Sequence, residues 1–504
     1  MRVTNNMIMS NTKININGNK TNVNTLNNQM TSQKKISKPS DDPVIAIRAL
    51  RLRSSLSQIN QYYEKNIPDA EAWLDVTETS LTNMKKLLTT IHTQCDAGAN
   101  GTLTEEDRKT ILKQLQSLSD QIYSEGDADY AGRTVFTGYK TNSTLTFQAD
   151  SKETYNISEY LSADKIEEYN YSYGNVKIPT AADVAAKTAP GTPENTTLHR
   201  LRLSYDNITD ITGGKISYSY TDTTTGQMTT KELNVTTVTT SDLEASSYAI
   251  ADNDIVFNKD TGEFLMGKTL ASNLKSLGAT VSVNYDKTGF SKGELRPENY
   301  FDCTNNTDAA NPIQYTNFEN GKRVRQDIEY TIASNQTLVV NTQASDIFDM
   351  NILRDINELI DIVQKSINAH TKVDDLKEMM TQSKYVGDEK LTAKLQTYLD
   401  AAQKEADYAD DNIQKTYEQY IGNFNGYLDT VNIGIANVGS TEVRLTMTQT
   451  RVENQTTTVT ELKSQNEDRD ISDIIIDYYA SYYAYQASLT AAGKINQTSL
   501  LDYI

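Results

Sequence analysis

The sequence of 504 residues has few of the residues on which several classes of protein depend. Its two cysteines, Cys95 and Cys303, are too few for the disulfide framework of a secreted fold, and neither belongs to a zinc-ligand pattern. Three histidines leave little material for general acid–base catalysis near neutral pH. No apolar run approaches the ~18 residues of a membrane span, and the N-terminal segment lacks the apolar core of a cleaved signal peptide. We therefore expect a chain that is soluble when made and spans no membrane.

Proline is also scarce, with 8 residues, about 1.6% against the usual ~5%. Apolar residues make up 37% of the chain, which is low for its size. Long uninterrupted helices or long regular strands would leave such a composition. The sequence favours an extended architecture over a compact globule.

Acidic residues outnumber basic ones, 67 to 48, and the net charge is −19. A surface of this sign repels phosphate backbones and anionic lipid head groups, so we expect neither nucleic acid nor a membrane as partner. Residues 1–60 differ from the rest, because nine basic and two acidic residues give them a net charge of +7 and leave −26 for the remainder. This basic segment is compatible with a chance difference between helices and with a role in export or at an interface.

The N-terminal head is rich in asparagine, with ten among the first 28 residues. This composition has low helix propensity and offers little apolar surface to offset the loss of chain entropy. We expect the head to be mobile before assembly.

Helical signals begin after the head. Asp42 can cap a helix whose first turn contains Pro43, and apolar residues then step by four and three, the spacing of a coiled coil. Pro68 predicts a kink or break just before it, and the same spacing returns over residues 73–95. Thr104 starts a further helix, which we expect to pair antiparallel with the one before it.

From about residue 140 to 345 the composition shifts to Thr, Tyr, Asn, Val and Asp. Short alternating runs such as 215–220 and 279–285 are typical of strands. Residues 255–266 are expected to form a hairpin in which Gly262 supplies the positive φ that the loop requires.

The helical period returns at Phe348 and continues to about residue 465, and a last helix follows. Helices at both ends around a strand-rich middle predict an α+β fold in which the terminal segments pack together and the middle is an inserted domain. We expect three parts: a terminal helical region of residues 1–42 and 466–504, a helical core domain of residues 43–140 and 346–465, and an outer β-rich domain of residues 141–345.

Short motifs occur towards both ends of the chain. They are MRVTNNM at 1–7, ISKPSDDP at 36–43, RALRLRSSL at 48–56, AGANGTL at 97–103, YAGRTVFTG at 130–138, NVGS at 437–440, ASL at 487–489 and SLLDYI at 499–504. Together they resemble the type 3 flagellar hook-associated proteins, a flagellin-like family that forms the hook–filament junction. Flagellin shares the helical ends, but Pro43 after the acidic pair and the closing residues look like the junction protein. The chain departs from the family at Pro68, and residues 146–320 carry no matching motif.

The resemblance implies a structural role in the bacterial flagellum. Members of this family are held by an export chaperone, secreted unfolded through the flagellar type III apparatus without a cleaved signal peptide, and assembled outside the cell. They form a ring on the type 1 hook-associated protein, with flagellin or the filament cap protein above. A flagellin-type filament subunit is one alternative. A surface adhesion or binding module in the outer domain is another, although a solvent-facing sheet explains its Thr and Asn content equally well.

Residues that could carry catalysis do not converge in the sequence. His92 and Cys95 lie one helical turn apart and could offer two metal ligands, but two further ligands are not identifiable nearby. A glycine-rich phosphate loop and a nucleophile elbow are absent. We expect no enzyme activity, no catalytic or metal residue and no cofactor.

The last helix carries the residues that we expect to form an assembly interface. One face has a 4-3-4 spacing and consists of Tyr478, Tyr482, Tyr485 and Leu489. We expect it to pack on the head at four apolar residues, Met7, Ile14, Leu26 and Met30. Tyr479 and Tyr483 lie on an adjoining face, which we assign to neighbouring subunits of the ring. The alternative is that all five rings belong to an intramolecular core.

Overall fold

The structure is a computed structural model and describes residues 5–99, 104–186, 188–222, 226–319 and 321–497. Its backbone divides into two units. The terminal unit consists of Met1–Glu71, Tyr330–Leu338 and Val443–Ile504, and the central unit consists of Ala72–Glu329 and Val339–Glu442. Two long helices, α3 (Ile67–Ala99) and α10 (Glu389–Glu467), contribute residues to both units. The three-part division expected from the sequence remains a prediction. The closing motif at 499–504, residues 1–4 of the first motif and residues 100–103 of the fourth lie outside the described residues.

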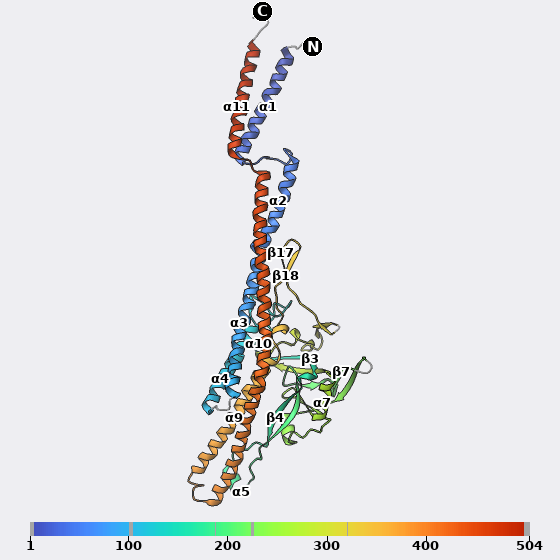
Figure 1. The fold of residues 1–504 in the computed structure, drawn as a ribbon, viewed down its shortest axis with the longest axis vertical. Coiled ribbons are helices and arrows are strands. Elements are labelled where there is room, and N and C mark those ends of the chain that lie inside the picture. The colour runs from blue at the N-terminus through green and yellow to red at the C-terminus, as the bar shows by residue number, and fades with distance from the viewer. Residues whose placement is uncertain (1–4, 100–103, 187, 223–225, 320, 498–504) are drawn as a thin grey trace, which may run out of the picture. The chain divides into compact units, whose positions relative to one another are not determined.

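Helices make up both ends of the chain in sequence order, and strands make up its middle, which is green to yellow in Figure 1. The other long helices are α1 (Asn5–Ser32), α2 (Pro43–Gln61), α4 (Glu105–Gly126), α9 (Asn351–Thr381) and α11 (Ile471–Gln497). The short ones are α5 (Ala181–Ala186), α6 (Thr240–Ala245), α7 (Lys268–Ser276) and α8 (Ala344–Ile347). The α+β class predicted from the change in hydrophobic period is confirmed.

Two sheets contain most of the strands. The smaller has the order β4–β5–β11–β10–β9, with bounds β4 (Glu167–Tyr173), β5 (Glu194–Arg202), β9 (Thr236–Val238), β10 (Ile255–Asn258) and β11 (Glu263–Met266). The larger has the order β14–β13–β3–β12–β7–β8, with β6 also on β12. Its bounds are β3 (Ser151–Ser162), β6 (Asp210–Ile211), β7 (Lys215–Thr221), β8 (Met228–Asn234), β12 (Thr280–Phe290), β13 (Asp302–Asn305) and β14 (Ile313–Tyr315).

Three strand pairs lie outside these sheets. They are β1 (Asp129–Tyr130) with β2 (Arg133–Thr134), β15 (Phe318–Glu319) with β16 (Lys322–Arg323), and β17 (Glu329–Ala333) with β18 (Gln336–Val339). The strands expected from alternation are confirmed, since β7 and β12 pair antiparallel. The expected hairpin is confirmed as β10 and β11, and Gly262 has φ +65. A Cβ at this glycine would also lie 2.0 Å from the carbonyl oxygen of Tyr205, so both space and φ require glycine here.

Helix starts follow the expected capping chemistry. The Asp42 carboxylate accepts hydrogen bonds from the amides of Val44 and Ile45, at 2.9 and 3.1 Å, and Pro43 occupies the first turn of α2. Thr104 and Asp107 form a reciprocal capping box at the start of α4. The predicted starts of both helices are confirmed.

Helix α2 is followed by a π-helical segment, Tyr62–Asn66, and then by α3. The irregularity therefore lies directly before Pro68, as expected, but it widens the helix and does not break the chain into two separate helices. A proline removes one amide donor, and a π-helical turn is one of the ways in which a helix accommodates such a defect.

The core of the central unit includes the second coiled-coil stripe predicted in the sequence. Its residues on α3 have no exposed surface: Trp73, Thr77, Met84, Leu88, Ile91 and Cys95. Helix α4 packs against α9, and Ser80 Oγ on α3 donates to the carbonyl oxygen of Glu125 at 2.7 Å. The expected partnership of α4 with α3 is thus joined by a second one with α9.

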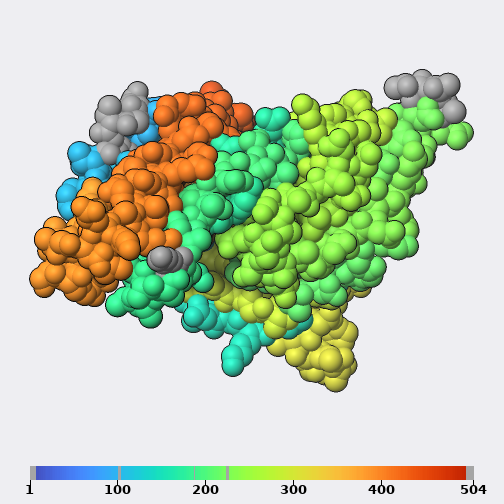
Figure 2. All heavy atoms as spheres, turned by 90° about the horizontal axis from the view of Figure 1, so that it is seen from below, coloured from blue at the N-terminus to red at the C-terminus, as the bar shows by residue number. Residues whose placement is uncertain are grey.

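A row of polar side chains on α10 holds the β4–β5 hairpin. The row repeats every seven residues and consists of Tyr398, Glu405, Asn412 and Gln419. Tyr398 donates to the carbonyl oxygen of Thr188 at 2.9 Å, the amide of Val176 donates to Glu405 at 2.7 Å, Asn412 donates to Ser172 at 2.7 Å, and Gln419 donates to Glu167. Val176 and Val184 also pack into the apolar cluster between α9 and α10. Figure 2 shows this contact, where the green chain lies against the orange helices.

Candidate functional site

Helices α1 and α11 lie side by side in the terminal unit (Figure 1). On α1, a stripe with 4-3 spacing is half-buried and consists of Thr12, Ile16, Asn19, Val23, Leu26 and Met30. On α11, a stripe with the same spacing consists of Ile474, Tyr478, Ser481, Tyr485, Ser488 and Ala492, of which Ile474 is fully buried. The asparagine-rich head is therefore helical where its apolar seam meets a partner, because tertiary packing outweighs its low intrinsic propensity.

Charged and polar side chains join α1 and α2 to the end of α10 and to the segment that leads into α11. Arg53 on α2 makes a two-pronged pair with Glu467 at the end of α10, at 2.7 and 2.6 Å. Lys34 pairs with Asp468 and lies 3.5 Å from Glu467. Arg469 Nη1 donates to the side-chain oxygen of Gln29 at 2.7 Å. These contacts form a joint that holds the segment after α1 and the side of α2 against the C-terminal end of α10 and the residues that follow it.

The ionisation of the joint follows from these contacts. The hydrogen bond from Arg53, with its charge and that of Lys34, holds the pKa of Glu467 below its usual value. The hydrogen bond from Lys34 lowers the pKa of Asp468 and raises that of Lys34 itself. Both carboxylates stay charged at neutral pH, so the joint is intact under those conditions.

The ten residues expected at the assembly interface fall into two groups. Four of them lie in the half-buried seam: Leu26, Met30, Tyr478 and Tyr485. The other six are exposed: Met7, Ile14, Tyr479, Tyr482, Tyr483 and Leu489. The expected contact of Tyr482 and Leu489 with Met7 and Ile14 is wrong, because all four side chains are exposed. The half-buried seam instead contains Ser481 and Ser488 on α11 and Ile16 on α1. An interface role for these residues remains a prediction.

One side of α11 presents aromatic and aliphatic side chains to solvent. Tyr479 is 55% exposed and Tyr483 is 63% exposed, and their rings stack with centroids 6.4 Å apart. Tyr478 and Tyr482 stack in the same way at 6.1 Å. Ile475 and Ile476 are also exposed. Such a surface is typical of a protein–protein contact.

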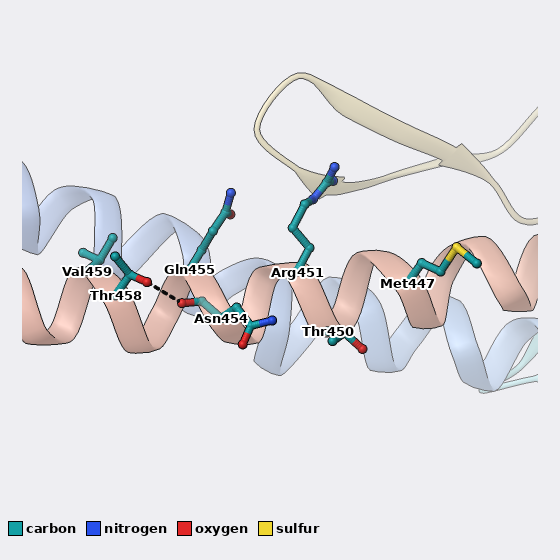
Figure 3. A pocket seen from close by; sticks show the side chains of 7 residues that line it. All are labelled: Met447, Thr450, Arg451, Asn454, Gln455, Thr458 and Val459. Carbon is teal, nitrogen blue, oxygen red and sulfur yellow. Dashed lines mark hydrogen bonds between the residues drawn. The ribbon is translucent and has the colours of Figure 1, made fainter.

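A shallow groove of about 450 Å³ lies along α10 in the terminal unit (Figure 3). It is lined by Met447, Thr450, Arg451, Asn454, Gln455, Thr458 and Val459. Arg451 donates to the side-chain oxygen of Gln336 on β18. Hydroxyl and amide side chains with one paired arginine provide no acid–base pair, so the groove has no evident chemistry of its own.

The central unit contains a buried cluster of charges between the smaller sheet and the helices. Arg200 Nη1 lies 2.8 Å from Glu263 and 2.7 Å from Glu358, and Arg202 Nη2 lies 2.6 Å from Asp355. Burial disfavours the charged form of Glu358, but the two arginines outweigh burial and hold its pKa well below the usual range. The cluster fastens the sheet to α9 and has the character of a structural joint.

Two constellations could suggest catalysis. Ser366 Oγ donates to Asp410 at 2.8 Å and His370 Nε2 lies 3.0 Å from the same carboxylate, so serine and histidine both face the aspartate and do not form a nucleophile–base pair. His92 Nδ1 lies 3.1 Å from Asp96, and burial raises the pKa of Cys95 to about 12, which keeps the thiol protonated.

Within the described ranges, no group of three or more His, Cys, Asp or Glu side chains is placed to hold a metal ion. None of the described helices is long and apolar enough to cross a bilayer.

Residues 3–141 match the model of the bacterial flagellin N-terminal helical region. The N-terminal part of the chain is similar to that family. Flagellar hook-associated protein 3 of Salmonella typhimurium is 31% identical to this chain over 125 residues, which are 25% of this chain and 39% of that protein. Its namesake in Escherichia coli is 31% identical over 114 residues, 22% of this chain and 36% of that protein. The resemblance to the type 3 hook-associated proteins is confirmed.

The match to the flagellin N-terminal helical region covers α1, α2, α3 and α4, the helices that carry the head seam and Arg53. The aligned part spans less than half the length of either curated relative.

Solved structures with related names superpose poorly. A hook-associated protein from Vibrio parahaemolyticus gives a TM-score of 0.28 at 14% identity, over 82% of this chain and 100% of that one. A flagellar junction protein from Legionella pneumophila gives 0.23 at 10% identity, over 81% and 100%. TM-scores this low do not establish a shared arrangement, so the relationship rests on sequence.

Proposed function

We propose that this chain is a structural subunit of the bacterial flagellum and forms the junction between hook and filament. The observation that carries the proposal is the 31% identity to flagellar hook-associated protein 3 over 125 residues, beside the match of residues 3–141 to the flagellin N-terminal helical region. The exposed aromatic side of α11 supports it, because a subunit that stacks on others needs a large surface free of intramolecular partners. No catalytic step and no cofactor belong to this role.

The proposed partners follow from the place of a junction subunit. One side of the ring binds the type 1 hook-associated protein, the other binds flagellin or the filament cap protein, and the ring itself is held by contacts between copies of this chain. Before export through the type III apparatus, a chaperone covers the terminal helices. The protein then works outside the cell. Met7, Ile14, Tyr479 and Tyr483 are proposed interface residues because their side chains face solvent in the single chain.

Immunogold electron microscopy of native flagella tests the proposal. An antibody against this chain is expected to label only the joint at the base of the filament. Labelling along the whole filament would identify a flagellin-type subunit. Absence of label from the flagellum, with label on the cell surface, would contradict the junction role and favour an adhesion module carried by the strand-rich region.

A further inference from the structure

We infer that the exposed face of α2 on one copy of this chain binds the exposed face of α11 on a second copy. The inference rests on the proposed function, because it names the two surfaces through which the copies associate. It uses one surface that the α1–α11 pairing leaves open and another, on α2, that is not among the interface residues expected from the sequence.

Helix α2 presents apolar side chains outward although it has a partner on its other side. Val44 is 59% exposed, Ile47 is 53% exposed and Leu50 is 65% exposed, while its only buried residues are Ala46 and Ala49. With three to four residues per turn, the three large side chains lie on one side of the helix. A surface helix normally turns such residues to a core, so this side fits a contact with another protein.

The same side of α2 carries positive charge without a counterion. Arg48 and Arg51 are exposed and take part in no ion pair with any residue that the structure describes. Arg53, on the same helix, is by contrast fully engaged by Glu467. The sequence of α2 contains no acidic residue. Two unpaired arginines beside three exposed aliphatic side chains are complementary to a partner surface that is both acidic and apolar.

Helix α11 offers such a surface. Its solvent side carries Ile475, Ile476, Tyr479 and Tyr483, and its first basic residue is Lys494, near its end. Asp470 and Asp473, at its start, are exposed and form no salt bridge within the described ranges. The two surfaces therefore agree in both polarity and sign of charge.

The charges also decide between two modes of self-association. Two α11 faces together would place like charges opposite each other, and so would two α2 faces, which disfavours a symmetric dimer. When α2 of one copy binds α11 of another, every pair of copies still has one free α2 face and one free α11 face. Repetition then gives a closed ring or an open helix of copies, according to the rotation between neighbours.

Disulfide cross-linking between two differently tagged full-length chains tests the contact. One chain carries Leu50→Cys and the other Tyr479→Cys, while the native Cys95 and Cys303 are buried and do not compete. The matched control replaces Tyr479→Cys by Ala484→Cys, an exposed position on a different face of α11. The mixed pair is expected to cross-link ~10-fold faster than the control pair, because the contact raises the local thiol concentration.

Charge reversal provides the second arm. Arg48→Glu with Arg51→Glu in the Leu50→Cys chain is expected to return cross-linking to the control rate, and Asp473→Lys in the Tyr479→Cys chain is expected to restore part of it. Cross-linking of Leu50→Cys or Tyr479→Cys only with itself would overturn the inference in favour of a symmetric pair. Equal rates for the probe and control pairs would overturn it as well.

The result is separable from that of the proposed function. Gold label at the flagellar joint together with no preference in cross-linking would leave the junction role standing and remove the α2 contact. Specific cross-linking of a chain that never reaches the flagellum would do the reverse.

Discussion

The guanidinium of Arg200 has no exposed surface and is shared by carboxylates from a strand and a helix. Removing it leaves Glu263 and Glu358 buried without their counter-charge, which costs far more than the pair itself contributes. We predict that Arg200→Ala destabilises the central unit by about 3–5 kcal/mol. The single tryptophan, Trp73, is buried in that unit, so its fluorescence during urea unfolding measures the effect.

A matched control for this measurement is Lys215→Ala. Lys215 and Glu232 form a pair at 3.0 Å with both side chains more than half exposed, and loss of such a pair is expected to cost less than about 1 kcal/mol. Similar destabilisation by the two substitutions would mean that Arg200 is not the fastening point of the sheet.

Glu467 gives the terminal unit a dependence on pH. Its pKa in the folded chain is lowered by the hydrogen bond from Arg53, so its stabilising contribution is fully present above the ordinary glutamate pKa near 4.5 and disappears as the pH falls through the lowered value. Glu467→Gln should therefore weaken amide protection of α2 at pH 7 and make little difference in strong acid. Amide hydrogen exchange of the unchanged chain and of Glu467→Gln, at pH 7 and in strong acid, measures the difference in protection of α2.

Glu461→Gln is the control for that comparison, since Glu461 is exposed on the same helix and lacks an ion pair among the described residues. Its protection pattern should match the unchanged chain at every pH. A pH-independent loss of protection in Glu467→Gln would show that the side chain acts through packing and not through its charge.

At the scale of the element, α11 has one side that packs on α1 and another that is exposed to solvent. Tyr479→Ala with Tyr483→Ala is predicted to leave the melting temperature unchanged, because both rings are more than half exposed, and to weaken association with a second copy of the chain by ~10-fold or more. Calorimetry and a binding titration on the same preparation measure the two quantities.

The companion variant places the same change in the seam. Tyr478→Ala with Tyr485→Ala removes half-buried rings, so it should reduce the helicity of the α1–α11 pair before any effect on assembly. If Tyr479→Ala with Tyr483→Ala lowered the melting temperature and assembly remained intact, these two rings would belong to the intramolecular core and not to an interface.

Elements whose signals are local could be predicted from the sequence. The start of α2 depends on two adjacent residues, the N-cap Asp42 and Pro43 in the first turn, and the β10–β11 hairpin depends on Gly262 and its neighbours. The seam of the head was harder, because Ile14 and Ile16 are equally apolar and only one of them is in phase with Leu26. Stepping back from Leu26 by three and four reaches Ile16, so the signal was present. The cluster around Arg200 had none, since its carboxylates lie in strands and helices remote in sequence.

At the scale of the whole molecule, each unit should respond separately to loss of the head. Removing residues 1–30 deletes most of α1 and exposes the seam of α11, but leaves every residue of the central unit in place. We predict an unchanged urea midpoint by Trp73 fluorescence, reduced total helicity by circular dichroism, and loss of both export and junction assembly. Secretion of the shortened chain at the normal level would contradict the export part of this prediction.

The strand-rich region depends on the helices that flank it in sequence. Arg200 and Arg202 find their carboxylates on α9, and the β4–β5 hairpin finds its polar partners on α10. A fragment of residues 146–345 alone would leave these groups without partners. A search for ligands of this region, including glycans, is therefore best made with the full chain.

The seven-residue repeat of polar contacts on α10 limits which changes of length the helix tolerates. Seven residues turn an α-helix through nearly two full turns, so a deletion or duplication of seven within Tyr398–Gln419 keeps the remaining contacts on the same side. One added residue rotates everything beyond it by about 100° and carries the later contacts away from the β4–β5 hairpin. Natural or designed variants of this protein should accordingly differ in length here by multiples of seven, and libraries of insertions read out by the thermal stability of the folded chain would display that period.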